Sequence, residues 1–205
     1  MSLIRFELGN KIIGYVRNQK CGSTSFMNYA MQALKDWPAY YKPARSGFVK
    51  HLGGNSYIGR DEGFESYEKE LMECDIRIAT YRDPVSKFIS GYQHVLDGPQ
   101  SDMVWRSRPR NLDLFIKEFD HFLGYQPVSD HCRSNTWKLG PDKKIYTHVL
   151  DYINLDRIIP VLEELCGRQI KSVQHRKQNF KTPVTHRQAI AIKGLMAEDY
   201  TNGWA

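Results

Sequence analysis

The stretch KIIGYVRNQKCGSTSFMNYAMQAL, residues 11–34, decides the fold class. Its first part, residues 11–17, is rich in the β-branched and aromatic side chains typical of a strand, and residues 23–34 have the apolar spacing of a helix. A short polar segment, residues 18–22, separates the two. The stretch therefore predicts a strand, a tight loop and a helix, which is the unit that builds parallel α/β sheets.

A second unit of the same kind starts with the sequence DIRIATY at residues 75–81. This strand leads into Asp83, which can cap a helix, and Pro84, which suits the first helical position; the helix should reach about His94. Further predicted elements are strands over 47–52 and 145–150 and helices over 64–74, 112–122, 154–166 and 187–200. Since no repeat or linker divides the chain, we expect one α/β domain, residues 1–205, with a central parallel sheet flanked by helices.

Composition restricts the class of protein. The 205 residues are 41% hydrophobic and 25% charged, as in a folded soluble chain, and no apolar run is long enough for a membrane helix. We therefore expect a soluble, cytoplasmic protein without an integral membrane segment. The net charge of +6 favours an anionic partner without saying which one. The four cysteines are far apart and form no C-x-x-C pair, which predicts reduced thiols and no metal site.

The loop over residues 19–25 has the composition of a phosphate site. A strand that turns through glycine into a helix leaves backbone N–H groups available, and the helix dipole favours an anion there. Lys20 adds a positive charge, Gly22 permits close approach of the backbone, and Ser23 to Ser25 add hydroxyl donors. Lys20 precedes the glycine, unlike the lysine of the common ATP-binding loop, which argues against a Mg-ATP site. The alternative is an ordinary helix capped by Ser23.

The sequence RDPVSKFISGY, residues 82–92, again stands where a strand passes into a helix. The carboxyl ends of parallel strands share one edge of the sheet, where such folds bind ligands. Both loops could therefore contact one molecule that carries two separated phosphate groups, with Arg82 and Ser90 as donors to one of them. The alternative for Arg82 is a structural ion pair with Asp83.

Together the two segments resemble the sulfotransferases that use 3′-phosphoadenosine 5′-phosphosulfate (PAPS). The first family signature, P-K-x-G-[ST]-[ST], is matched by residues 19–24 with Gln19 in place of proline. The second, R-D-P-x-x-R-x-x-S-x-Y, is matched by residues 82–92 with Lys87 in place of the second arginine. Further likeness at residues 130–131, 146–149, 155–156 and 195–200 is closest to the Golgi-type carbohydrate sulfotransferases, the chondroitin 4-O- and HNK-1-type branch.

The resemblance implies a P-loop-like sulfotransferase topology, PAPS as sulfate donor, adenosine 3′,5′-bisphosphate as product and no metal. It implies an acceptor hydroxyl, with a carbohydrate as the favoured acceptor. The residues that would bind the donor are Lys20, Cys21, Gly22, Ser23, Thr24, Ser25, Arg82 and Ser90.

The expected reaction is in-line transfer of a sulfuryl group. It requires stabilisation of the leaving phosphate oxygen, which we assign to Lys20, and removal of the acceptor proton. The resemblance favours His51 as the base, and His131 is the second candidate, which could instead orient the acceptor with Asp130 fixing its tautomer.

Three alternatives stay open at this point. An ATP-dependent small-molecule kinase would need Ser or Thr directly after the loop lysine, where Cys21 stands. A nucleic-acid-binding module would use the arginines of residues 106–110 and 168–187, although no nucleic-acid-binding signature accompanies them and we expect no nucleic-acid partner. A nucleotide-binding but inactive sulfotransferase-like protein is conceivable because of Gln19 and Lys87.

Overall fold

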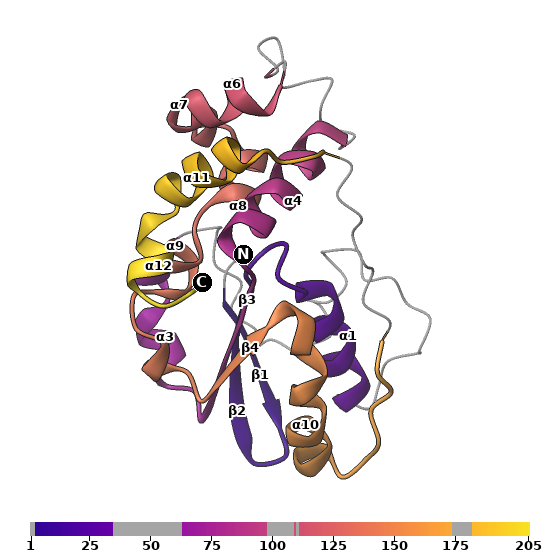
Figure 1. Cartoon of the computed structure of the whole chain (residues 1–205). Coiled ribbons are helices and arrows are strands. Elements are labelled where there is room, and N and C mark those ends of the chain that lie inside the picture. Colours follow the sequence, from indigo (N-terminus) through magenta and orange to yellow (C-terminus); the bar gives the residue numbers. More distant parts are fainter. Residues whose placement is uncertain (1–2, 35–62, 98–108, 110, 174–181) are drawn as a thin grey trace.

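The computed structural model describes residues 3–34, 63–97, 109, 111–173 and 182–205, and Figure 1 gives their arrangement. Four strands form one sheet in this part of the chain, in the order β1-β2-β3-β4. They are β1 (Leu3–Leu8), β2 (Lys11–Val16), β3 (Ile76–Tyr81) and β4 (His148–Asp151). β2, β3 and β4 are parallel, whereas β1 is antiparallel to β2. The predicted α/β class is therefore confirmed, with a sheet that is mostly rather than wholly parallel.

The antiparallel strand β1 was not expected from the sequence. It pairs with β2 through a two-residue turn at Gly9 and Asn10, in which Gly9 has a left-handed φ of 61°. A Gly-Asn pair between two apolar runs is a hairpin signal, so the sequence does carry the information for this strand.

The helices follow the predicted alternation with the strands. α1 (Ser23–Ala33) comes after β2, η1 (Phe64–Ser66) and α3 (Glu68–Met72) come before β3, and α4 (Pro84–Asp97) comes after it. The next are α6 (Leu112–Lys117), α7 (Phe119–Leu123), α8 (Gln126–Cys132), α9 (Asn135–Leu139) and η2 (Lys143–Ile145). η3 (Tyr152–Ile158), α10 (Ile159–Cys166), α11 (His186–Leu195) and α12 (Ala197–Thr201) complete the chain.

Four of the predicted helices are divided in the structure. The helix expected over 64–74 is interrupted at Tyr67, between η1 and α3, and the one expected over 154–166 consists of the 3-10 helix η3 followed by α10. The helix expected over 112–122 is interrupted at Glu118, between α6 and α7, and the one expected over 187–200 is interrupted at Met196, between α11 and α12. The strand expected over 145–150 is shorter and begins at His148, after η2. The strand expected over 47–52 lies outside the described residues.

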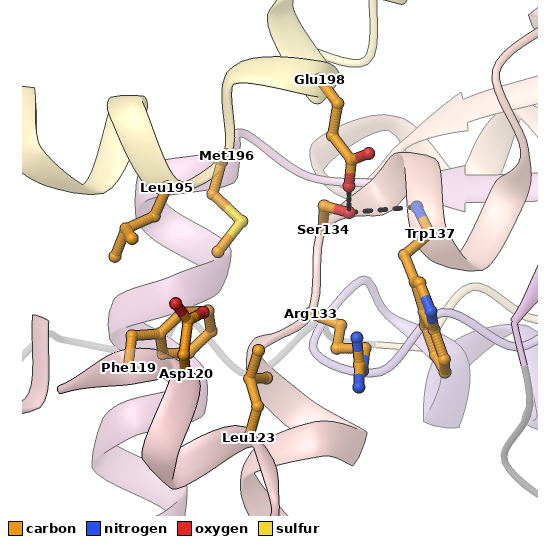
Figure 2. Close-up of a pocket in the computed structure, with 9 residues that line it drawn as sticks. All are labelled: Phe119, Asp120, Leu123, Arg133, Ser134, Trp137, Leu195, Met196 and Glu198. Carbon is orange, nitrogen blue, oxygen red and sulfur yellow. Dashed lines mark hydrogen bonds between the residues drawn. The ribbon is translucent and has the colours of Figure 1, made fainter.

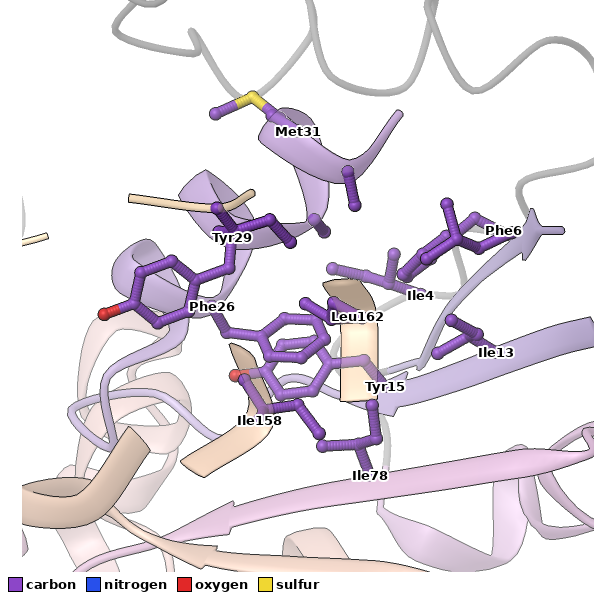
Figure 3. Packing of buried hydrophobic residues seen from close by; sticks show 14 of the residues in the cluster. Ile4, Phe6, Ile13, Tyr15, Phe26, Tyr29, Met31, Ile78, Ile158 and Leu162 are labelled. Atoms are coloured by element: carbon purple, nitrogen blue, oxygen red, sulfur yellow. The ribbon is translucent and has the colours of Figure 1, made fainter. Parts of the chain in front are cut away.

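The sheet separates two apolar cores. On one face, α1 and α10 cover β1 and β2, and the Tyr15 and Phe26 rings stack with centroids 3.7 Å apart (Figures 1 and 3). On the other face, Val16 and Ala79 pack with Leu71 and Trp204. This division follows the period-2 alternation of a strand, because Tyr15 and Val16 are neighbours in β2 and face opposite sides.

A third apolar cluster lies among the helices α4, α6, α7, α8 and α11, which gather beyond one end of the sheet (Figure 1). The chain leaves β2 and β3 toward this end. Because Val16 in β2 pairs with Ala79 in β3, the loops that follow the two strands begin side by side. Within the described ranges, no helix combines the length and apolar character needed to cross a membrane.

Candidate functional site

The loop between β2 and α1, residues 18–22, is built on two left-handed residues. Lys20 has φ 64° and Gly22 has φ 79°, and the Cys21 amide donates a hydrogen bond to the Asn18 carbonyl oxygen at 3.3 Å. A Cβ atom at position 22 would lie 2.0 Å from Leu155 Cδ1. Glycine is therefore required at position 22 by both conformation and packing. We call residues 18–22 the Lys20 loop.

The first turn of α1 is open toward this loop. Gly22 is the N-cap residue, no side chain caps the helix, and its first turn carries no acidic residue. Among the described residues, the amides of Gly22, Ser23 and Thr24 have no hydrogen-bond acceptor. The alternative of a helix capped by the Ser23 side chain is therefore wrong. Amides directed out of a helix end, with the positive end of the helix dipole, favour an anion.

Lys20 contributes the charge of this loop. Within the described part of the chain, its ammonium group has neither an ion pair nor a hydrogen bond. Burial lowers the pKa of Lys20 to about 8, and the nearby positive charge of Arg82 acts in the same direction, against an opposing effect of Cys132. Burial and a neighbouring cation both disfavour the charged form of this lysine, and an anion beside it would favour that form.

Arg82 follows β3 and approaches the Lys20 loop. Its guanidinium Nη1 donates a hydrogen bond to the Lys20 carbonyl oxygen at 3.3 Å, and its guanidinium carbon lies 4.7 Å from the centroid of the Tyr152 ring. The neighbouring Asp83 carboxylate accepts a 2.8 Å hydrogen bond from the Ser86 amide. The predicted capping role of Asp83 is therefore confirmed. We call residues 82–83 the Arg82 loop.

A buried polar network beneath the two loops was not predicted from the sequence. The Asn18 side-chain amide donates to the Thr80 carbonyl oxygen at 3.1 Å and to Asn135 Oδ1 at 2.8 Å. The Asn135 side-chain amide donates to the Arg82 carbonyl oxygen at 3.0 Å, and the Asp199 carboxylate accepts from the Asn135 backbone amide at 2.8 Å. The partners are separated by up to 117 residues in sequence. No local signal could have identified them.

Lys87, Ser90 and Tyr92 of the second signature are buried within the helix packing. Lys87 donates a 2.7 Å hydrogen bond from Nζ to the Arg133 carbonyl oxygen, and burial lowers its pKa. Its ammonium group therefore joins α4 to the link between α8 and α9. Ser90 has no exposed surface. Its predicted role, in which the Ser90 hydroxyl donates a hydrogen bond to a phosphate group, stays a prediction.

The described residues include one of the two candidate bases. His51 is outside the described residues. His131 is buried near the end of α8, where its ring meets the exposed His94 ring of α4 with centroids 4.3 Å apart. The next residue, Cys132, is close enough to Lys20 to affect the pKa of its ammonium group. The structure thus brings α8 toward the Lys20 loop, and the role of His131 stays a prediction.

A pocket of about 130 Å³ lies between α7, α9, α11 and α12 (Figure 2). The Arg133 guanidinium lies over the Trp137 ring, 4.4 Å from its centroid, and the Ser134 hydroxyl donates to the Glu198 carboxylate. The remaining lining residues are Phe119, Asp120, Leu123, Leu195 and Met196. The volume is smaller than the roughly 300 Å³ at the lower end for small-molecule sites, so this pocket does not fit a nucleotide.

The structure therefore brings the predicted donor-binding residues 20–25 together with Arg82 at one edge of the sheet. All four cysteines are free, as predicted, and burial raises the pKa of Cys21 to about 11, which keeps its thiol protonated. Comparison of the chain with family models, with curated proteins and with solved structures found no match.

Proposed function

We propose that the chain is a PAPS-dependent sulfotransferase that transfers a sulfuryl group to an acceptor hydroxyl, with a carbohydrate as the favoured acceptor. The observation that carries the proposal is the meeting of the two cationic loops. Lys20 and Arg82 follow adjacent parallel strands, and Arg82 donates a 3.3 Å hydrogen bond to the Lys20 carbonyl oxygen. Two cations at one edge, each from a different loop, suit a ligand with two separated phosphate groups.

The Lys20 loop is suited to the phosphosulfate end of such a donor. The amides of Gly22, Ser23 and Thr24 and the uncapped end of α1 would hold the anionic oxygens. The Lys20 ammonium group would lie against the oxygen that bridges phosphorus and sulfur, where negative charge develops as the sulfuryl group departs. The donor supplies the sulfuryl group, and the loop supplies positive charge at the leaving oxygen.

The Arg82 loop is suited to the 3′-phosphate. A guanidinium group binds a phosphate through two parallel hydrogen bonds, and the Tyr152 ring lies on one side of this group at 4.7 Å. The topology is consistent with the proposal as well. β2, β3 and β4 run parallel, and each signature follows one of the neighbouring strands β2 and β3, as in a P-loop-like sulfotransferase.

The acceptor hydroxyl must lose its proton as it attacks, and we assign this step to His51 or His131. The residue after Lys20 is Cys21, a fully buried thiol whose pKa is raised by burial. It therefore lacks the hydroxyl that a P-loop kinase places next to its lysine to hold magnesium. This argues against the kinase alternative.

The test is single-turnover transfer of radiolabelled sulfate from PAPS to a panel of oligosaccharide, phenol and steroid hydroxyls. We expect transfer by the wild-type chain and a loss of at least about a hundredfold in Lys20→Ala, because the charge at the leaving oxygen is removed. Lys20→Arg, which keeps the charge in a different shape, is the matched control and should retain part of the rate. Binding of adenosine 3′,5′-bisphosphate without transfer to any acceptor would instead support the inactive nucleotide-binding alternative.

A further inference from the structure

The first residue of α9, Asn135, connects three separate parts of the chain. It has no exposed surface, and both polar atoms of its side chain form hydrogen bonds. Its Oδ1 accepts a 2.8 Å hydrogen bond from Asn18, and its Nδ2 donates to the carbonyl oxygens of Arg82 at 3.0 Å and Trp204 at 3.3 Å. An asparagine amide provides both donors and an acceptor in one plane, which no other uncharged side chain of this size offers.

These bonds hold the Lys20 loop through the Asn18 side chain and the Arg82 loop through a backbone carbonyl oxygen. Asn18 begins the Lys20 loop, and the Cys21 amide in turn bonds to its carbonyl oxygen. The Arg82 carbonyl oxygen belongs to the residue whose guanidinium group donates to the Lys20 carbonyl oxygen. Asn135 therefore bonds to the first residue of each loop, in addition to the direct bonds of Asn18 to Thr80 and of Arg82 to Lys20.

The position of Asn135 is itself fixed from the end of the chain. The Asp199 carboxylate accepts hydrogen bonds from the Asn135 amide at 2.8 Å and the Thr136 amide at 2.6 Å, which satisfies the first turn of α9. The Trp204 indole N–H donates to the Gly140 carbonyl oxygen at 2.8 Å, beyond the other end of this helix. α9 is thus held at both ends, so Asn135 has little freedom to follow a displaced loop.

We propose that Asn135 is a positioning residue that sets the distance between the Lys20 loop and the Arg82 loop, so that both phosphate groups of one nucleotide are bound at once. This inference rests on the proposed function. It predicts that Asn135 contributes to the coupling between the two phosphate sites rather than to either site alone. A ligand that bridges the loops gains from correct spacing, whereas a ligand with one phosphate does not.

The experiment measures the affinities of adenosine 3′,5′-bisphosphate and adenosine 5′-monophosphate by calorimetry for the wild type and Asn135→Ala. In the wild type the bisphosphate should bind at least about tenfold more tightly, because only it contacts both loops. In Asn135→Ala this ratio should fall by at least about threefold, even if both ligands bind more weakly. An unchanged ratio in a folded variant would overturn the inference.

A general loss of stability must be separated from a change in spacing. Ile192→Ala is the matched control, because Ile192 is fully buried in the helical cluster and belongs to neither loop. It should lower the unfolding temperature and leave the affinity ratio unchanged. If Asn135→Ala does not fold, Asn18→Ala decides by the same ratio. It removes the bond between Asn135 and the Lys20 loop, together with the bond from Asn18 to the Thr80 carbonyl oxygen, and leaves the bonds of Asn135 to Arg82, Trp204 and Asp199 in place.

The wild-type measurement separates the two hypotheses. A wild type that binds the bisphosphate no more tightly than the monophosphate would contradict the proposed function, and the inference about Asn135 would fail with it. A wild type with a clear preference and an Asn135→Ala variant with the same preference would contradict the inference alone.

Discussion

The guanidinium carbon of Arg82 lies 4.7 Å from the centre of the Tyr152 ring, so the residue that follows β3 is supported by the residue that follows β4. The same ring approaches the Lys20 loop, because its Cδ2 atom would lie 3.3 Å from a Cβ atom at position 22. Tyr152 thus forms a common wall for both loops. The cation–π contact orients the guanidinium group before any ligand arrives.

Tyr152→Leu should weaken the binding of adenosine 3′,5′-bisphosphate by roughly 2- to 30-fold, which corresponds to about 0.5–2 kcal/mol for the lost cation–π contact. Tyr152→Phe keeps the ring and should bind within about twofold of the wild type. Calorimetric titration of the three proteins makes this comparison. Equal weakening in both variants would mean that the hydroxyl, rather than the ring, supports Arg82.

Gly22→Ala should destabilise the fold by more than about 2 kcal/mol. The φ of 79° is unfavourable for alanine, and the new methyl group would lie 2.0 Å from Leu155 Cδ1. Gly194→Ala is the control, since a Cβ there meets no atom within 4 Å and the residue lies in α11. Alanine at position 194 should be neutral or stabilising by up to about 1 kcal/mol. Urea unfolding of both variants tests this, and a similar effect at both sites would contradict the described conformation of the Lys20 loop.

The affinity for the bisphosphate should depend on pH through Lys20. The pKa of Lys20 is lowered to about 8, so the ammonium group is charged below pH 8 and loses its proton above it. A bound anion favours the charged form, which means that the free protein must take up a proton to bind above pH 8. Affinity should therefore be nearly constant from pH 7 to 8 and then fall by up to about tenfold per pH unit.

Lys20→Arg is the control for this pH dependence, because arginine keeps its charge throughout the range. Its affinity should stay nearly constant from pH 7 to pH 9.5. Calorimetry at several pH values compares the two profiles. Parallel profiles would show that a group other than Lys20 is responsible for the decrease.

Lys138 should make the stability of the fold depend on pH. Burial lowers the pKa of Lys138 to about 7, and the positive charge of Arg17 adds to this effect. In the unfolded chain the pKa of lysine is about 10.4. Between pH 7 and this value, Lys138 is protonated in the unfolded chain but largely deprotonated in the folded chain, so the free energy of unfolding rises with pH. Between pH 7 and pH 8.5 the free energy of unfolding, measured by urea unfolding, should rise by about 1.6 kcal/mol more in the wild type than in Lys138→Met. An equal rise in the free energy of unfolding in both proteins would contradict the lowered pKa of Lys138.

The sequence could predict those parts of the fold that depend on local patterns. Residues 11–34 and 75–97 form a strand, loop and helix as expected, and Asp83 caps α4. These features depend on the alternation of apolar residues and on capping chemistry, which operate over a few residues. The hairpin strand β1 was missed although its Gly9-Asn10 turn carries a local signal.

The buried part of the site could not be predicted in this way. Lys87 keeps the positive charge of the arginine that it replaces, yet its ammonium group bonds to the Arg133 carbonyl oxygen inside the helix packing. The bonds between Asn18, Asn135 and Arg82 depend on where α9 packs against the sheet, which is a tertiary property. Sequence patterns indicate which residues have suitable chemistry, whereas packing decides which of them face the ligand.

The central claim is that the Lys20 loop and the Arg82 loop form one site for a nucleotide with two separated phosphate groups. The most direct measurement is calorimetric titration of adenosine 3′,5′-bisphosphate without metal, next to ATP with magnesium, on the wild type and on Arg82→Ala. We predict micromolar binding of the bisphosphate by the wild type, much weaker binding by the variant, and no comparable binding of ATP. Failure of the wild type to bind the bisphosphate, or equal binding by Arg82→Ala, would contradict a shared site and with it the proposed sulfotransferase activity.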